Sequence, residues 1–212
     1  MKYNYLFLVL ITLFSSCEKK KDVSEVVKSE SLISPAKGNY KLDISKSTLS
    51  WIGKEITTKT HTGTIDIKSG KIRVEENKSV SGEVLLSMIT LNVTDLEGKS
   101  KEYLEGHLKS EDFFGVNDFP EAKLTFKSNN LSKDQNRLSF DGELTIKSIT
   151  EKVTFDAVLK KENPFLEADA SLTFDRTKFN VRYRSGSFFD DLGDKLILDD
   201  IKVNMNIIAE KL

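Results

Sequence analysis

The sequence predicts an all-β fold, an antiparallel sandwich or barrel of eight or nine strands. Apolar and polar residues alternate at period two almost throughout from Tyr40 onward, as in strands with one apolar face. Short polar turns separate these alternating runs. The polar positions are rich in Lys, Asp, Glu, Ser and Thr, so we expect the outer face to meet water and the apolar side chains to point inward. A membrane-spanning barrel would have the reverse pattern.

The turns divide the alternating region into its expected strands. One turn is expected at Lys46-Ser47 and another at Ser69-Gly70. The polar run 129–136 and the connection 148–150 separate later strands. The apolar faces comprise Tyr40, Leu42, Leu49, Trp51, Ile65, Ile67, Ile72, Val74, Val80, Gly82, Val84, Leu86, Met88, Ala122, Leu124, Phe126, Leu138, Phe140, Gly142, Leu144, Ile146, Val153, Phe155, Ala157, Leu159, Leu166, Ala168, Ala170, Leu172, Phe174, Ile201, Val203, Met205 and Ile207.

One helical segment interrupts the strands, within residues 94–114. Residues 94–108 lack strand periodicity and instead place Leu96, Tyr103, Leu104 and Leu108 at helical spacing. We expect one or two helical turns there. Ser110 is expected to cap a further short helical turn by accepting a backbone hydrogen bond.

Three aromatic residues follow on an irregular connection that leads into a strand. They are Phe113, Phe114 and Phe119, and Pro120 biases Phe119 to an extended conformation. Large apolar rings in a loop must be buried, so we expect them at the mouth or floor of a barrel. Together with Phe188-Phe189 they are candidates for a lipid entrance, and the alternative is ordinary core packing.

The N-terminus resembles a bacterial lipoprotein signal. A short apolar run, residues 5–14, precedes Ser15, Ser16 and the single cysteine, so that Phe14-Ser-Ser-Cys17 is similar to a lipobox. The resemblance implies a signal peptide at residues 1–16, cleavage before Cys17 and diacylglycerol on its sulfur. The alternative is a plain secretory signal with an incidental cysteine. Residues 17–38 are polar and are interpreted as a flexible tether. We therefore expect a lipid-anchored protein of the bacterial cell envelope, on the periplasmic side or at the cell surface.

The charge balance argues against nucleic acid as a partner. Lys2 is the only charged residue before Cys17, so the chain without residues 1–16 has 31 basic and 33 acidic residues. A broad positive field is therefore absent, and nucleic-acid binding depends on such a field.

Several short motifs together resemble the YceI family. They are Tyr40-Lys-Leu-Asp43 with Trp51, His61-Thr-Gly63, Gly82-Glu-Val-Leu85, His107-Leu-Lys-Ser-Glu-Asp-Phe-Phe114, Phe119-Pro120, Phe140-Asp-Gly-Glu-Leu-Thr-Ile146, Thr150-Glu-Lys-Val153, Phe174-Asp-Arg-Thr-Lys-Phe179 and Leu192-Gly-Asp194. The resemblance covers residues 40–209. It implies that residues 39–212 form an extended antiparallel eight-stranded barrel of lipocalin-like shape, which binds an amphiphilic polyisoprenoid in its interior.

The leading functional hypothesis is a membrane-tethered carrier of an isoprenoid or similar apolar lipid, without enzymatic activity or a cofactor. One alternative is a packed structural or stress-response interaction module, and another is a hydrolase or isomerase acting on the lipid. A homodimer is a further candidate assembly. The expected ligand-binding residues are Trp51, His61, His107, Phe113, Phe114, Phe119, Phe126, Phe140, Phe179, Arg182, Tyr183 and Phe188.

Three other residue groups are candidates for polar sites. His61 and His107 are the only histidines, which is fewer than the three protein ligands of a typical catalytic zinc site, so no metal is expected. The acidic run 190–200 lacks the spacing of a calcium loop and is interpreted as a solvated turn. For Arg176, Arg182 and Arg184 two partners are candidates, namely a lipid head group or carboxylates on neighbouring strands.

Overall fold

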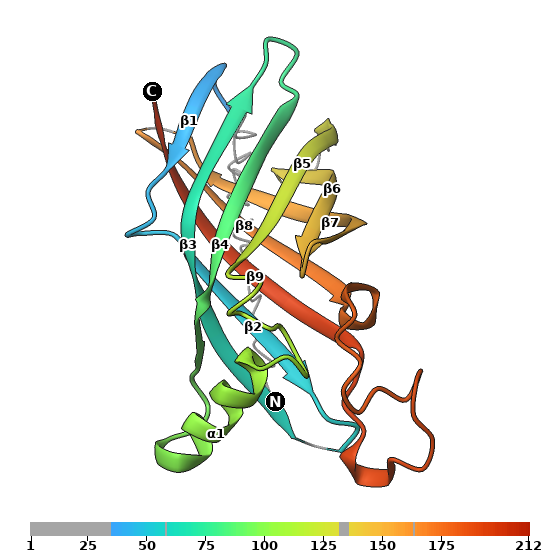
Figure 1. Ribbon diagram of the computed structural model, residues 1–212. Coiled ribbons are helices and arrows are strands. Elements are labelled where there is room, and N and C mark those ends of the chain that lie inside the picture. The colour runs from blue at the N-terminus through green and yellow to red at the C-terminus, as the bar shows by residue number, and fades with distance from the viewer. Residues whose placement is uncertain (1–34, 58, 132–135, 163) are drawn as a thin grey trace, which may run out of the picture. The chain divides into compact units, whose positions relative to one another are not determined.

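The alternating sequence forms nine antiparallel strands and one α-helix in the part of the chain that the computed structural model describes, residues 35–57, 59–131, 136–162 and 164–212 (Figure 1). The strands are β1 (Gly38–Leu42), β2 (Thr48–Lys54), β3 (Thr60–Val74), β4 (Val80–Val93), β5 (Glu121–Leu131), β6 (Arg137–Ile146), β7 (Ile149–Lys161), β8 (Phe165–Asp175) and β9 (Asp200–Lys211). The helix is α1 (Gly98–Lys109), and η1 (Arg176–Phe179) and η2 (Gly193–Lys195) are short 3-10 turns. The expected signal peptide and lipidated Cys17 lie outside the described residues.

The strands close into the expected eight-stranded barrel with one extra strand. From β2 the hydrogen-bonded order is β9-β8-β7-β6-β5-β4-β3, and β3 pairs with β2 to complete the ring. The extra strand β1 lies end to end with β2 in one position of that ring. Both pair with β3 and β9, β2 at residues 60–64 and 202–206, and β1 at residues 71–74 and 209–211.

The turn between β1 and β2 lies where the sequence placed it. The Asp43 carboxylate accepts hydrogen bonds from the Ser45 backbone N–H and hydroxyl, and Lys46 forms an ion pair with it at 2.5 Å. The described end of the expected tether, residues 35–38, lies against the barrel. The Tyr40 hydroxyl donates to the Ala36 carbonyl at 2.7 Å, and Pro35 is fully buried.

Two expectations about turns were wrong. Ser69-Gly70 is not a turn, because β3 continues through it with a register shift between Ile67 and Ser69. The glycine is needed for close packing, since an added Cβ at Gly70 would lie 2.5 Å from a methyl group of Leu42. The Ser110 side chain does not cap the turn that follows it, because its hydroxyl donates to the His107 carbonyl at the end of α1, at 2.8 Å. The turn itself is present, since the Ser110 carbonyl accepts from the Phe113 N–H at 3.1 Å.

Half of the barrel interior is filled by aromatic and aliphatic side chains. This half lies beside β1, at the upper end in Figure 1. The rings of Phe140 and Phe155 stack at 5.0 Å, and Phe126 meets them edge-on at 5.3 and 5.9 Å. An added Cβ at Gly82 would come within 2.7 Å of the Phe126 ring, so the missing side chain makes room for that ring.

A buried arginine fixes the loops at the opposite end. Arg176 has no exposed surface. Its guanidinium donates to the backbone carbonyls of residues 181, 197 and 198 and to the Asp199 carboxylate at 3.2 Å. Burial lowers its pKa, and the negative charge of Asp199 opposes that shift. Arg176 therefore has a carboxylate partner, and its described hydrogen bonds hold the segment after η1 against the segment before β9.

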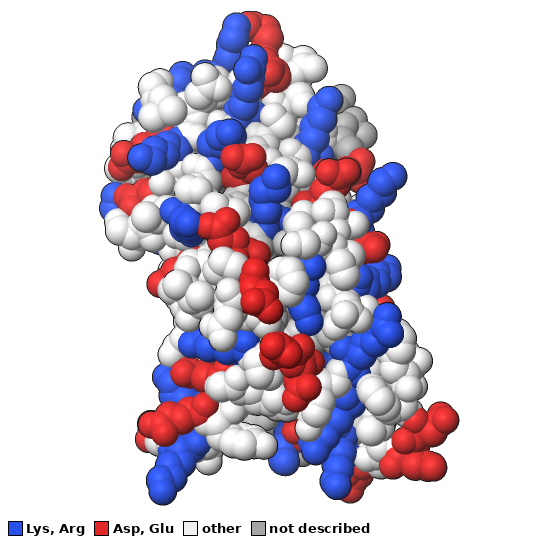
Figure 2. Space-filling model, viewed as in Figure 1, with Lys and Arg blue, Asp and Glu red and all other residues white. Residues whose placement is uncertain are grey.

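Lys and Arg side chains are interspersed with Asp and Glu over the face of the barrel in Figure 2. Within the described residues, helices are too short or too polar to cross a membrane.

Candidate functional site

The other half of the barrel encloses a cavity of about 520 Å³. Its deep wall consists of inward-facing residues of the strands, which are Leu49, Trp51, Ile65, Val84, Leu86, Met88, Leu91, Ala122, Leu124, Leu144, Ile146, Leu172, Phe174, Ile201, Val203 and Met205. These are aliphatic or aromatic side chains, and the indole N–H of Trp51 is the polar group among them. The volume lies in the range of small-molecule binding pockets, about 300–1,000 Å³.

The period-two alternation explains why this wall is apolar. In β6, Leu144 and Ile146 are buried, whereas the intervening positions are more exposed. The strands show the same alternation in the half beside β1. The two halves differ instead in the size of the side chains that point inward. The aromatic cluster of Phe126, Phe140 and Phe155 fills one half, while mainly aliphatic residues line the other and leave space.

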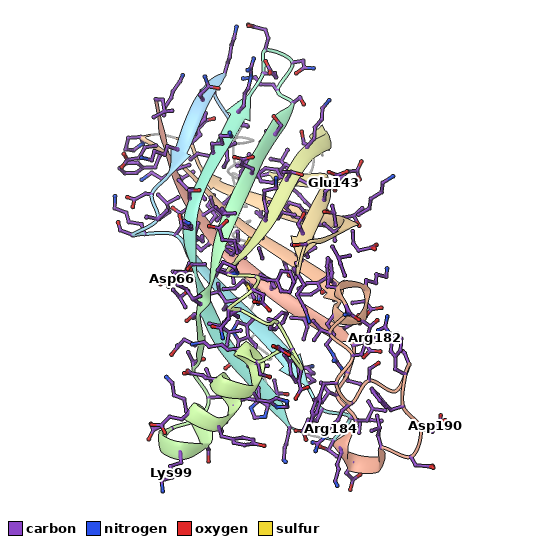
Figure 3. All side chains as sticks on the ribbon, viewed as in Figure 1. Asp66, Lys99, Glu143, Arg182, Arg184 and Asp190 are labelled. Carbon is purple, nitrogen blue, oxygen red and sulfur yellow. The ribbon has the colours of Figure 1, made fainter. Side chains whose placement is uncertain are left out.

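The cavity opens toward α1 and the loops that precede β9. Its mouth is lined by Lys99, Ser100, Tyr103, Leu104, His107 and Leu108 of α1, by Lys54 and Glu55 at the end of β2, and by Tyr183, Arg184 and Ile197. In Figure 3, Lys99 and Arg184 lie toward this end of the barrel, and Glu143 lies in the other half. The mouth is thus polar and aromatic, and the interior is apolar.

Edge-on contacts between aromatic rings join the helix to the opposite loop. The His107 ring meets Phe113 edge-on at 4.9 Å and Tyr183 edge-on at 4.5 Å. The Arg184 guanidinium lies 5.1 Å from the centre of the Tyr183 ring. His107 therefore packs as an aromatic residue between two elements, and its Nε2 also lies 3.5 Å from the Asp112 carboxylate.

His61 faces a carboxylate at the mouth. Its Nδ1 lies 2.8 Å from Asp95, which also accepts a hydrogen bond from the Thr62 N–H at 2.8 Å. Partial burial raises the pKa of the Asp95 carboxyl, but these hydrogen bonds outweigh burial and lower it. Among the described residues, His, Cys, Asp and Glu side chains do not gather in groups of three that could hold a metal ion.

The structure brings together six of the twelve residues expected to bind ligand. The residues that line the cavity are Trp51, His61, His107, Phe113, Phe114 and Tyr183. The other six lie elsewhere, and each packs on a different part of the fold.

Phe126 and Phe140 belong to the packed half of the barrel. Phe179 is buried against Phe174, with ring centres 5.5 Å apart. Phe119 packs near Gly115, outside the lining.

Arg182 and Phe188 lie on the outer surface, where the guanidinium is 4.5 Å from the centre of the ring.

Sequence reasoning missed several residues at the mouth. Lys54, Lys99 and Tyr103 come from β2 and α1, and only the folded chain places them around one opening. Local sequence gave no signal for this gathering. The helical spacing of Tyr103 indicated a helix face but not what that face borders.

Comparison with known proteins places the chain in a family. A YceI-like domain is matched over residues 40–209, most of the chain. The chain belongs to the YceI-like family. Among YceI-like relatives, UPF0312 protein plu2095 of Photorhabdus laumondii is 26% identical over 176 residues, covering 82% of this chain and 88% of that protein. Protein YceI of Shigella flexneri is 31% identical over 97 residues, covering 46% of this chain and about half, 48%, of that protein.

Among solved structures with this architecture, two are matched over nearly their whole length. Burkholderia cenocepacia BcnA has a TM-score of 0.62 at 20% identity, covering 79% of this chain and 98% of BcnA. A polyisoprenoid binding domain from Saccharophagus degradans has a TM-score of 0.59 at 11% identity, covering 82% of this chain and 98% of that domain. Both likenesses concern the fold.

Proposed function

We propose that this protein binds one apolar lipid, a polyisoprenoid or a chain of similar shape, in the barrel cavity and carries it without chemical change. The observation that supports this most strongly is the cavity of about 520 Å³ with an apolar wall and a polar mouth. The family, and the polyisoprenoid binding domain that shares the fold, favour the same ligand class.

The volume sets the length of chain that the cavity accepts. At about 30 Å³ for each methylene-sized group, near the share of a water molecule in liquid, 520 Å³ holds about 17 such groups. Fifteen carbons correspond to about three isoprene units. Burial at about 0.8 kcal/mol per methylene then contributes roughly 12 kcal/mol. Association costs of about 4–15 kcal/mol oppose this gain, so useful affinity depends on filling most of the cavity.

The surface around the mouth suits the passage of a lipid between a bilayer and the interior. Five large apolar side chains are exposed at this end: Ile56, Tyr103, Phe188, Phe189 and Leu198. The backbone connects two of their segments, since the Ile56 N–H donates to the Leu196 carbonyl at 2.9 Å. An apolar chain that enters here meets apolar contacts before it reaches the cavity.

The wall supports binding over catalysis. The titratable side chains that line the cavity are at its mouth, apart from Arg176, whose guanidinium is occupied by backbone carbonyls and Asp199. A reaction inside the barrel needs a general acid, base or nucleophile within reach of the chain.

The packed half of the barrel supports the alternative of a structural or interaction module to a limited degree. That alternative requires a full interior, and the α1 half is hollow. The carrier therefore fits the geometry better.

We also propose that a lipid on Cys17 tethers the protein to a membrane of the cell envelope, which keeps the cavity near its ligand source. The lipobox-like Phe14-Ser-Ser-Cys17 supports this. In fractionation of a bacterial host, the full chain is expected with the membranes and Cys17→Ser in the soluble fraction. A Cys17→Ser protein that stays with the membranes would contradict the tether.

Native mass spectrometry of the full chain purified from a bacterial host tests the carrier proposal. We expect a mass increase of one lipid beyond the covalent anchor, which disappears after solvent extraction. Extracted protein should then melt at a higher temperature with farnesol, a fifteen-carbon isoprenoid. Protein without an extractable lipid, and with an unchanged melting temperature in farnesol, would contradict it.

A further inference from the structure

The cavity ends at one level of three neighbouring strands. Toward the packed half, its lining stops at Val84 on β4, Leu124 on β5 and Leu144 on β6. These residues share one level of the wall, because Leu124 is paired with Val84 on one side and with Leu144 on the other. Side chains of directly opposed residues lie on the same face of an antiparallel sheet. The floor of the cavity is therefore the next inward-facing level, two residues further along each strand.

That next level consists of a phenylalanine between two glycines. Phe126 on β5 is paired with Gly82 on β4 and with Gly142 on β6. An added Cβ at Gly82 would lie 2.7 Å from Cζ of Phe126, so the ring lies over this glycine. An added Cβ at Gly142 would lie 3.3 Å from Cδ1 of Leu124, the last lining residue of β5. Because the glycines contribute no side chain, the ring of Phe126 closes this level on three adjacent strands.

The level beyond Phe126 is closed by a second set of rings. Phe140 on β6 is paired with Ser128, which lies two residues beyond Phe126 on β5. Phe140 is also paired with Phe155 on β7, and their two rings stack at 5.0 Å. Phe126 meets the Phe140 ring edge-on at 5.3 Å. Removal of the Phe126 ring should therefore deepen the cavity by one level, and the stacked pair should become its new floor.

One level of the interior has the size of one isoprene unit. The ring of Phe126 contains six carbons, and an isoprene unit contains five. At about 30 Å³ for each methylene-sized group, the cavity of about 520 Å³ holds about three such units. Loss of the ring should add space for about one more.

We propose that Phe126 sets the chain length of the ligand, because its ring stops the inner end of the lipid chain after about three isoprene units. This inference rests on the proposed lipid binding and names the length class of the ligand. A chain of twenty carbons then leaves its fourth unit at the mouth, in contact with water. Each methylene-sized group that moves from water into the cavity strengthens binding by about 4-fold, so the length limit is measurable as a selectivity.

Farnesol and geranylgeraniol, isoprenoid alcohols of fifteen and twenty carbons, compare two lengths with one head group. Both are delivered from cyclodextrin to extracted wild-type protein and to Phe126→Ala. The change in affinity for geranylgeraniol, divided by the change for farnesol, cancels the solubility of each alcohol and any general loss of binding. We expect this ratio to favour geranylgeraniol by at least about 10-fold, because burial of two further carbons already supplies about 16-fold.

Phe140→Ala is the matched control, because it removes the same ring one level further from the cavity, behind Phe126. Its ratio should stay within about 3-fold of unity, which is less than the value of one methylene. Phe126→Leu removes only three carbons and replaces Phe126→Ala if the alanine variant does not fold. It should shift the ratio in the same direction by about 4-fold or more, the value of one further methylene.

The wild-type protein alone provides a second measurement. Partition of the same alcohols into hexadecane gives the gain expected for complete burial of each added isoprene unit. The step from geraniol, with ten carbons, to farnesol should strengthen binding by about that gain. The step from farnesol to geranylgeraniol should add less than about 3-fold, because the added unit finds no further space in the cavity.

The outcomes separate this inference from the proposed function. Suppose that the wild-type protein binds farnesol, but the two steps in length add equally or the ratio of the Phe126 variant stays at unity. The chain-length proposal is then wrong and lipid binding stands. The same conclusion follows if Phe140→Ala shifts the ratio as much as Phe126→Ala. If the wild-type protein binds none of the three alcohols, both proposals are wrong.

Discussion

A pair of matched substitutions tests whether the two halves of the barrel differ as described. Ala122 on β5 lines the cavity, whereas Ala157 on β7 lies in the packed half. A change to phenylalanine adds six carbons at either position. At Ala122 these carbons enter open space and occupy about a third of the roughly 17 methylene-sized places in the cavity. At Ala157 they meet packed side chains.

The expected effects have opposite signs. Ala157→Phe should lower the free energy of unfolding by about 1–3 kcal/mol or more, the usual cost of overpacking. Ala122→Phe should leave it unchanged or raise it. Ala122→Phe should also displace up to six carbons of a bound chain, which is up to about 5 kcal/mol of binding at about 0.8 kcal/mol per methylene.

Urea unfolding of extracted protein and titration with farnesol measure both quantities. Lys123→Phe is the matched control, because Lys123 is the next residue of β5 and faces outward; it should leave farnesol binding intact. The reasoning is refuted if Ala122→Phe destabilises the protein as much as Ala157→Phe and binds farnesol normally.

Three further predictions concern stability. Gly63→Ala should destabilise the protein, since the added Cβ would lie 2.0 Å from the Asn92 carbonyl oxygen. Gly106→Ala in α1, where a Cβ meets open space, should raise the free energy of unfolding by about 0.5–1 kcal/mol. Equal unfolding midpoints of the two variants in urea would contradict this. Arg176→Met should lower the free energy of unfolding by about 3–5 kcal/mol in the same assay, because it leaves Asp199 without its buried ion-pair partner. A loss below about 1 kcal/mol would contradict the role of Arg176 in holding the loops together. Hydrogen bonds from Lys46, and secondly from Ser45, lower the pKa of Asp43 from 3.8 to about 2. The Asp43 carboxylate therefore stabilises the folded protein above about pH 4, and this stabilisation is lost as the pH falls toward about 2. Asp43→Asn should flatten the fall in melting temperature over that range, and an unchanged profile would show that Asp43 does not take part.

Alternation predicted the barrel because its physical cause is local. A strand with one buried face needs apolar side chains at every second position, and runs such as Leu138 to Ile146 show this directly. The inner face of each strand could therefore be read from the sequence. The closure of eight strands came from the family resemblance, and the structure confirms it.

Features that depend on distant contacts were not predictable in the same way. The sequence placed the connection between β6 and β7 at residues 148–150, but the hairpin turns at Lys147 and Ser148 and β7 begins at Ile149. Both turn residues have positive φ, although such turns usually contain glycine or asparagine. The position of the cavity could not be predicted from local sequence either. Phe140 and Leu144 lie on the same face of β6, and only the neighbouring strands determine that one packs in a cluster while the other borders open space.

Co-crystallisation with a bromine-labelled chain tests the central claim most directly. We predict that 16-bromohexadecan-2-one gives an anomalous bromine peak inside the barrel, within the wall that contains Leu49, Leu124 and Met205. A crystal grown with this probe that shows the same strands, side chains filling that space and bromine only on the outer surface would contradict the account.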